Sequence, residues 1–135
     1  MTKTCRYGFG TKVPLGFDLT VNKVEEMLNR RGFQITTRLR MDDILNVDRS
    51  ESFGRYLIFG ACNPHFARPL FNADPNIGLM MPCNLIIYEL QEGGCKVMIK
   101  DPVRVMDLID SPLAIEASMK IKGQLEEIIE ELAEL

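Results

Sequence analysis

The amino-acid sequence predicts a single α+β domain, with helices on one face of an antiparallel sheet of about five strands. Segments with apolar residues at every second position, or in short unbroken runs, predict strands. Between them lie segments whose apolar residues recur at three- and four-residue steps, which predict helices. A Gly-Gly step joins two strand segments as a hairpin. No linker, repeat or low-complexity tract divides residues 1–135, a length that suits one core. The expected order is β-α-β-β-(short α)-β-β-α.

The first part of the chain predicts a strand, a helix and a second strand. A short strand is expected at residues 4–9. Three- and four-residue spacing then predicts an amphipathic helix from residue 18 or 20, with the apolar residues Leu19, Val21, Val24, Met27 and Leu28. It should end at Arg30-Arg31-Gly32, because cations suit the negative end of a helix and glycine terminates it. Alternation over residues 33–39 predicts a strand with one solvent-exposed face.

The middle of the chain predicts a loop, a strand and a short helix. Residues 42–54 are mostly polar, which predicts a loop with room for one helical turn. The unbroken apolar run at residues 56–59 predicts a strand at the sheet centre or covered on both faces. Asn63 is a favourable N-cap and Pro64 a favourable first helical residue, so a short helix is expected over residues 64–72.

The last part predicts a hairpin and a long helix. Residues 84–90 and 95–100 are the expected strands, and the turn between them contains Gly93 and Gly94, which accept positive φ angles. After a connector over residues 102–112, apolar residues at helical spacing predict a helix over residues 113–132. Glutamates are expected on its exposed face.

Composition and charge exclude several classes of protein. The net charge is −3, with 16 Lys and Arg against 19 Asp and Glu, and aromatic residues make up only 7%. These values argue against a nucleic-acid-binding face. No uninterrupted apolar stretch is long enough to cross a membrane. Residues 1–10 lack the apolar segment of a signal peptide, so we expect a cytoplasmic protein whose four cysteines are thiols or ligands.

Two cysteines are candidates for chemistry. Cys62 directly precedes the predicted helix start, where the positive end of the helix dipole would stabilise a thiolate. Cys83 follows Pro82 at the start of a predicted strand. If the two thiols meet in the fold, they would form a redox pair, a thiol-acceptor site or half of a metal site. The alternative is that both are small buried hydrophobic residues. Cys5 and Cys95 lie outside both motifs, and we expect them to be ordinary strand residues.

A histidine and two arginines are weaker candidates. His65 would complete a set of three metal ligands with Cys62 and Cys83, of the kind that suits zinc, copper or iron. The alternative is that His65 simply lies on the polar face of the short helix and binds no metal. Arg38 and Arg40 would bind an anion through bidentate contacts, or simply form a solvated strand face. No nucleotide-binding, zinc-protease or serine-hydrolase motif is present.

Several short motifs resemble the bacterial and archaeal family of the domain of unknown function 302, over residues 16–132. The motifs are Gly60-Ala61-Cys62-Asn63-Pro64 with Ala67 and Leu70, then Gly78-Leu79, Pro82-Cys83 and Asp101-Pro102. The resemblance implies a compact α+β domain related in layout to the TATA-box-binding protein, and a homodimer. It implies no activity. The chain departs from the family pattern at residues 42–54, which lack a Lys- and Gly-containing stretch, and at His65.

Three functional hypotheses follow. The first is a homodimeric module that binds a metal ion or a sulfur-containing or thiol-reactive small molecule. Its site residues would be Cys62, Asn63, His65, Cys83, Arg38 and Arg40. The second is a structural or protein-interaction dimer without chemistry, in which Asn63 caps a helix, prolines fix turns and the cysteines fill gaps. The third is a thiol-dependent redox or transfer enzyme, which requires a cysteine of lowered pKa.

Overall fold

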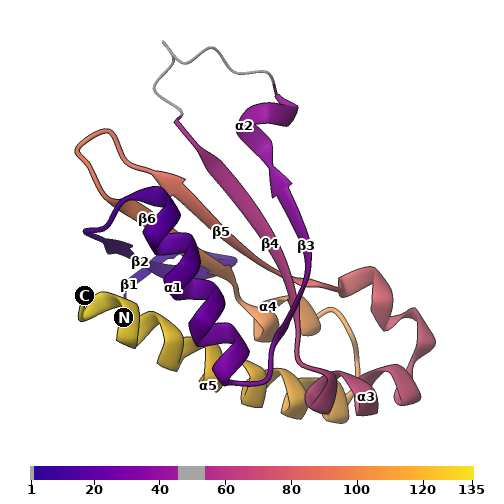
Figure 1. Cartoon of the computed structure of the whole chain (residues 1–135). Helices are drawn as coiled ribbons and strands as arrows, with labels where there is room; N and C mark the ends of the chain where they lie inside the picture. The colour runs from indigo at the N-terminus through magenta and orange to yellow at the C-terminus, as the bar shows by residue number, and fades with distance from the viewer. Residues whose placement is uncertain (1, 46–53) are drawn as a thin grey trace.

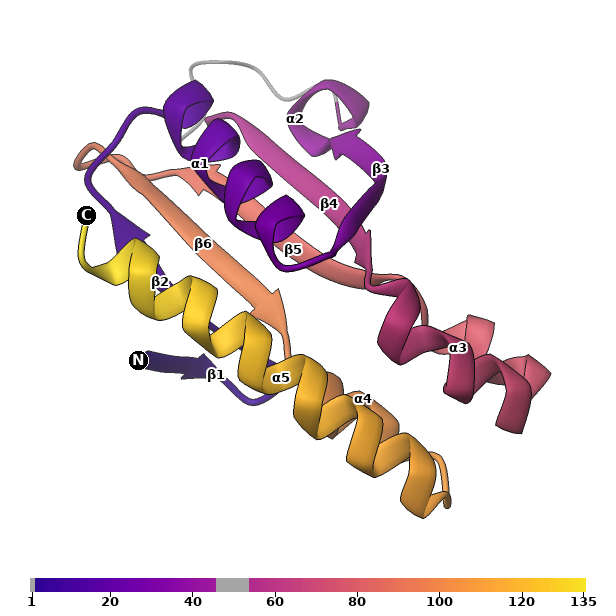
Figure 2. The ribbon, with the colours of Figure 1, turned by 60° about the horizontal axis from the view of Figure 1, so that its bottom comes forward.

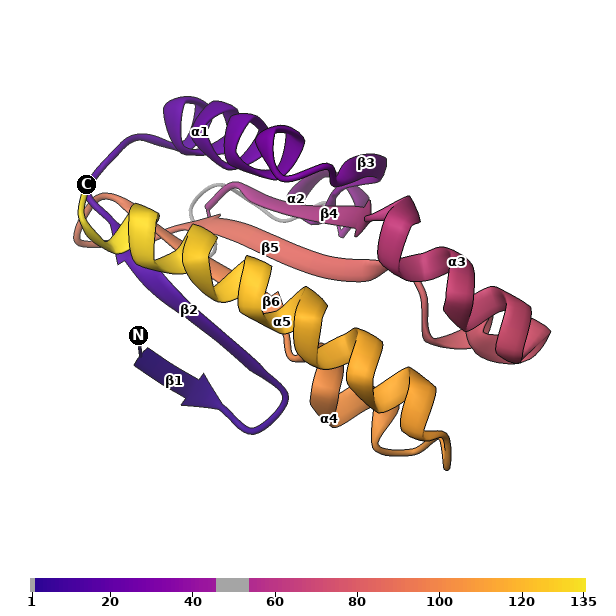
Figure 3. The same cartoon turned by 90° about the horizontal axis from the view of Figure 1, so that it is seen from below.

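The computed structural model describes residues 2–45 and 54–135 as two layers, a six-stranded sheet and the helices that cover one of its faces (Figure 1). The strand order is β1-β2-β6-β5-β4-β3, and every neighbouring pair is antiparallel. Helices α1 and α5 run across the same face of the sheet (Figures 2 and 3). The predicted fold class and element order are confirmed.

The N-terminal segment forms two strands where the sequence predicted one at residues 4–9. Strand β1 is Thr2–Cys5 and strand β2 is Gly8–Val13. The chain reverses between them, so that Cys5 pairs with Gly8. Strand β2 places Phe9 in the core and pairs with β6, whereas β1 adds a sixth strand at the edge. The reversal was missed because the turn has no glycine or proline at its centre.

The two long helices are where the sequence predicted them. Helix α1 is Phe17–Arg30 and helix α5 is Pro112–Ala133. Ser111 caps α5 by accepting a hydrogen bond from the backbone N–H of Ala114. Both helices pack on the sheet through their apolar stripes. The fully buried side chains of this core include Leu28, Phe59, Leu85, Ile87, Leu125 and Ile128.

A β-bulge changes which side chains of β3 face the core. Strand β3 is Gln34–Arg40, and its register with β4 shifts between Ile35 and Thr37. Because side chains alternate, the extra residue reverses the faces of every residue that follows. Arg38 therefore lies opposite buried Phe59 on the helix-covered face, and Leu39 lies on the open face, 47% exposed. The predicted alternation over residues 33–39 is wrong beyond the bulge.

The remaining elements follow the predicted order. They are α2 Met41–Ile44, β4 Tyr56–Cys62, α3 Pro64–Ala73, the 3₁₀ helix η1 Pro75–Met80, β5 Cys83–Glu89, β6 Cys95–Lys100 and α4 Pro102–Met106. Helix α2 is the helical turn expected in the segment 42–54, of which residues 46–53 lie outside the described part. The hairpin turn has φ angles of 98° at Gly93 and 75° at Gly94, as predicted.

One face of the sheet has no covering element in the described ranges. Strand β4 was predicted at the sheet centre or covered on both faces, and it lies between β5 and β3 with only one face covered. Its residues Leu57 and Phe59 are buried under the helices, whereas Tyr56 and Ile58 on the other face are only partly buried. Among the described helices, none has the length and apolar character needed to span a bilayer.

Candidate functional site

Asn63, the centre of the Cys-Asn-Pro motif, joins two helices. Its Oδ1 accepts a hydrogen bond from the backbone N–H of His65 at 3.2 Å, which caps α3 as predicted. Its Nδ2 donates to the backbone carbonyl of Arg31 at the end of α1, at 3.1 Å. Asn63 is 7% exposed. Both ends of its amide are therefore used inside the protein.

Cys62 and Cys83 lie at neighbouring strand ends but on opposite faces of the sheet. The register pairs Cys83 with Ala61, which is buried on the helix-covered face, and Cys62 is the next residue along β4. The Cys83 thiol donates to the carbonyl of Lys100 at 3.8 Å. Burial raises the pKa of Cys83 to about 11 and also raises the pKa of Cys62. Both thiols are therefore protonated at neutral pH, contrary to the thiolate expected at the helix start.

The three candidate metal ligands do not form a site. Across residues 2–45 and 54–135, no group of three or more His, Cys, Asp or Glu side chains is placed to hold a metal ion. Cys62, His65 and Cys83 all fall in those ranges. His65 is exposed at the start of α3, and its ring contacts Phe66 edge-on at 5.1 Å between centroids. The strand register puts the two thiols on opposite faces of the sheet, so the structure does not bring the three side chains together.

The two candidate anion-binding arginines already have carboxylate partners. Arg38 pairs with Glu25 at 2.7 Å and Arg40 pairs with Asp42 at 2.6 Å. The Arg40 guanidinium holds the pKa of Asp42 at about 2. Arg38 also lies over the ring of Phe59 at 5.6 Å from its centroid. These arginines cover the edge of the core, so an external anion would have to displace the carboxylate of Glu25 or Asp42.

Asp101, of the Asp-Pro motif, has a structural role like that of Asn63. It is 4% exposed and accepts hydrogen bonds from the backbone N–H groups of Val103 and Arg104, which caps α4. Its other oxygen accepts from Lys122 Nζ of α5 at 2.9 Å. Burial opposes ionisation, but Lys122 and the two N–H groups outweigh it and lower the pKa of Asp101.

The open face of the sheet carries a row of apolar side chains that crosses four strands. Strand register aligns one apolar residue of β3, β4, β5 and β6 with its partner on the neighbouring strand. We call this set the apolar row: Leu39, Ile58, Ile86 and Met98. This row was not predicted from the sequence. The signal was present in the unbroken runs 56–59 and 85–88, where apolar residues occupy both faces of a strand.

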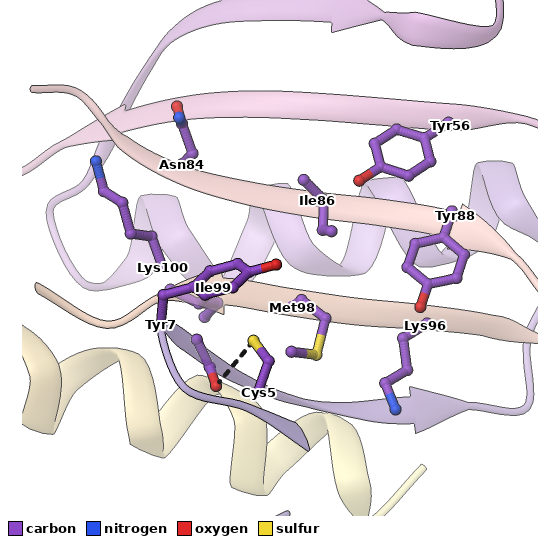
Figure 4. A pocket seen from close by; sticks show the side chains of 11 residues that line it. Cys5, Tyr7, Tyr56, Asn84, Ile86, Tyr88, Lys96, Met98, Ile99 and Lys100 are labelled. Carbon is purple, nitrogen blue, oxygen red and sulfur yellow. Dashed lines mark hydrogen bonds between the residues drawn. The ribbon is translucent and has the colours of Figure 1, made fainter. Parts of the chain in front are cut away.

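A hollow extends from the β5 and β6 end of the apolar row toward β1, and we call it the sheet-face hollow (Figure 4). Its volume is about 620 Å³. The floor is formed by Ile86 of β5 and Met98 of β6. Tyr56 and Tyr88 stack at one side with ring centroids 5.4 Å apart, and Tyr7 lies at the opposite side. Lys96 and Lys100 stand at two margins of the hollow.

The fold and motifs match a known family. The model of the domain of unknown function DUF302 matches residues 9–132. The crystal structure of an uncharacterised conserved DUF302 protein from Bacillus stearothermophilus is similar, with a TM-score of 0.82, 22% sequence identity, and coverage of 93% of this chain and 98% of that chain. At this identity the likeness concerns the fold alone. None of the curated proteins matches.

The motif residues named in the sequence analysis fall within the matched segment, and the structure gives Asn63 and Asp101 capping roles there. The chain therefore belongs to the family of the domain of unknown function DUF302.

Proposed function

We propose that this domain is a protein-interaction module that forms a homodimer through the open face of its sheet. The observation that carries the proposal is the apolar row, which runs without interruption from Leu39 to Met98. Contiguous apolar surface on a small domain marks an interaction site, because its exposure to water is unfavourable. A twofold axis through the row would place the same apolar side chains of both copies against each other.

The geometry of the motifs also supports a protein-interaction role. Asn63 and Asp101 cap helices and bridge elements, and Cys83 is a half-buried protonated thiol. None of these roles requires a reaction. The four cysteines are free thiols, which fits a reducing compartment such as the cytoplasm.

The test is the solution mass of the wild type and of charge variants, measured by sedimentation velocity at micromolar concentrations. The wild type should have twice the protomer mass of 15.3 kDa. Leu39→Asp and Ile58→Asp should be monomeric, because a charge buried in the interface has no partner. The matched control is Leu79→Asp in η1, where the native leucine is 86% exposed, and it should stay dimeric.

Two results would overturn the dimer proposal. One is a monomeric wild type. The other is dissociation by Leu79→Asp but not by Leu39→Asp, which would move the interface to the α3 and η1 end of the molecule. Circular dichroism of each variant separates dissociation from unfolding.

Ligand binding through Cys62 and Cys83 is the competing function, and native mass spectrometry of the same preparation distinguishes it. The dimer proposal expects the mass of two bare protomers. A bound metal or small-molecule adduct that disappears in Cys62→Ser/Cys83→Ser would favour the thiol site. The Cys5→Ser variant is the matched control, because Cys5 lies outside both motifs.

A further inference from the structure

We infer that the sheet-face hollow binds a planar aromatic anion. This inference goes beyond the dimer, because it assigns a small-molecule ligand to the open face, where the hollow and the apolar row share Ile86 and Met98. The hollow has a volume of about 620 Å³, within the range of small-molecule sites. Three features of its lining define the ligand: aromatic side walls, an apolar floor and an unbalanced positive charge.

The aromatic walls come from three separate parts of the chain. All three tyrosines of the protein line the hollow. Tyr56 and Tyr88 are cross-strand neighbours whose rings are nearly parallel, with 6° between their planes. Tyr7 belongs to the turn between β1 and β2 and is 73% exposed. Ile86 and Met98 lie between Tyr7 and the stacked pair (Figure 4), so a flat apolar body would rest on them with aromatic rings at both sides.

The charge of the lining is entirely positive. Two lysines and no Asp or Glu are among the residues that line the hollow, although the chain as a whole has a net charge of −3. Lys100 Nζ donates to the carbonyl oxygens of Met80 and Pro82, which are neutral groups. The Lys96 side chain makes no ion pair and no hydrogen bond with any group of residues 2–45 and 54–135, although its backbone is paired within the sheet. Its ammonium is therefore available to a carboxylate or a similar anion.

Lys96 and the aromatic pair are placed to act on the same ligand. The register pairs Tyr88 with Lys96 on adjacent strands, and both side chains lie on the open face. A ligand whose ring packs against Tyr88 would thus present an attached carboxylate within reach of Lys96. Lys12, the next residue across in the register, pairs with Glu92 at 3.5 Å. This leaves Lys96 as the anion-binding residue of the site.

The test uses 2-naphthoate as the probe, and isothermal titration calorimetry measures its dissociation constant. Neutral 2-naphthamide and cationic 2-naphthylmethylammonium have the same ring without the negative charge. The wild type should bind 2-naphthoate most tightly and the cation most weakly. Lys96→Gln should weaken 2-naphthoate binding about fivefold or more and change 2-naphthamide binding less than about twofold, because only the charged contact is lost. Tyr88→Leu should weaken both.

The matched control is Lys120→Gln, which removes an exposed lysine of α5 on the other side of the molecule and should leave binding unchanged. Ring resonances of the tyrosines in NMR spectra locate the probe, because every tyrosine lines the hollow. Equal affinity for the three probes, or affinity for 2-naphthoate that survives Lys96→Gln, would show adsorption to apolar surface and overturn the inference.

The ligand site and the dimer can fail independently. Ile86 and Met98 belong to both the apolar row and the hollow, so a dimer through the row would cover the floor of the hollow. Leu39 lies in the row but does not line the hollow, and Lys96 lines the hollow but is outside the row. The monomeric Leu39→Asp, whose hollow no second copy covers, should therefore bind 2-naphthoate at least as tightly as the wild type and with the same dependence on Lys96. Binding by this variant supports the ligand site whatever the oligomeric state. Absence of binding in both the wild type and Leu39→Asp overturns it and leaves the dimer unaffected.

Discussion

Replacement of Asn63 tests whether the Cys-Asn-Pro motif is structural. Asn63→Ala removes the N-cap of α3, which costs about 1 kcal/mol. It also removes the hydrogen bond to the Arg31 carbonyl and leaves that partly buried acceptor without this donor, which costs about 1 to 2 kcal/mol more. The expected loss of unfolding free energy is about 2 to 3 kcal/mol, because both contacts are made by one amide that is 7% exposed.

Asn63→Asp separates the two contacts. The carboxylate still accepts the hydrogen bond from the His65 N–H, but it has no donor for the Arg31 carbonyl. Asn63→Asp should therefore be less stable than the wild type although it keeps the cap of α3. His65→Ala is the control, since it keeps the backbone N–H that the cap uses, and it should change the unfolding free energy by less than about 0.5 kcal/mol.

Urea denaturation followed by circular dichroism measures all three variants. At this chain length a loss of 2 to 3 kcal/mol should lower the melting temperature by about 6 to 15 °C. The reasoning is refuted if Asn63→Ala unfolds within about 0.5 kcal/mol of the wild type. It is also refuted if Asn63→Asp is as stable as the wild type, because the hydrogen bond to the Arg31 carbonyl would then contribute nothing.

Two further predictions concern buried ionisable groups. The pKa of Cys83 is raised to about 11 in the fold, so the unfolded chain releases this proton at lower pH than the folded chain. The unfolding free energy should therefore fall as pH rises from about 9 to about 11. Cys83→Ala should remove about 2 to 3 kcal/mol of that fall, as measured by urea denaturation across this pH range. The pKa of Asp101 is lowered in the fold, so its contribution should be lost as pH falls below about 4. Asp101→Asn should cost about 1 to 3 kcal/mol at pH 7 and less at pH 3, and equal cost at both values would contradict the role of its charge.

Much of the fold was predictable because it depends on local interactions. The helices α1 and α5, the hairpin and the Asn63 cap rest on contacts between residues a few positions apart, and on glycines that accept positive φ. Capping residues and helical periodicity can therefore be recognised from the sequence alone. The same reasoning misplaced the first strand, because nothing local marks the reversal between Cys5 and Gly8.

The candidate site was predictable only in part, because it depends on which face each strand presents. Spacing allowed Cys62 and Cys83 to meet, but the register with Ala61 puts them on opposite faces. One extra residue in β3 moves Arg38 to the covered face and Leu39 to the open face. Strand register is a long-range property, and a shift of one residue inverts every side chain that follows.

The local pattern of the chain thus determines the α+β class, the main helices and the caps, since each of these is stabilised within a few residues. Tertiary pairing determines the open face, the apolar row and the sheet-face hollow. Their side chains come from different strands and from the turn at Tyr7, and they become neighbours only when the sheet assembles. The sequence contains these residues, but only the register places them together on a surface that a partner or ligand can contact.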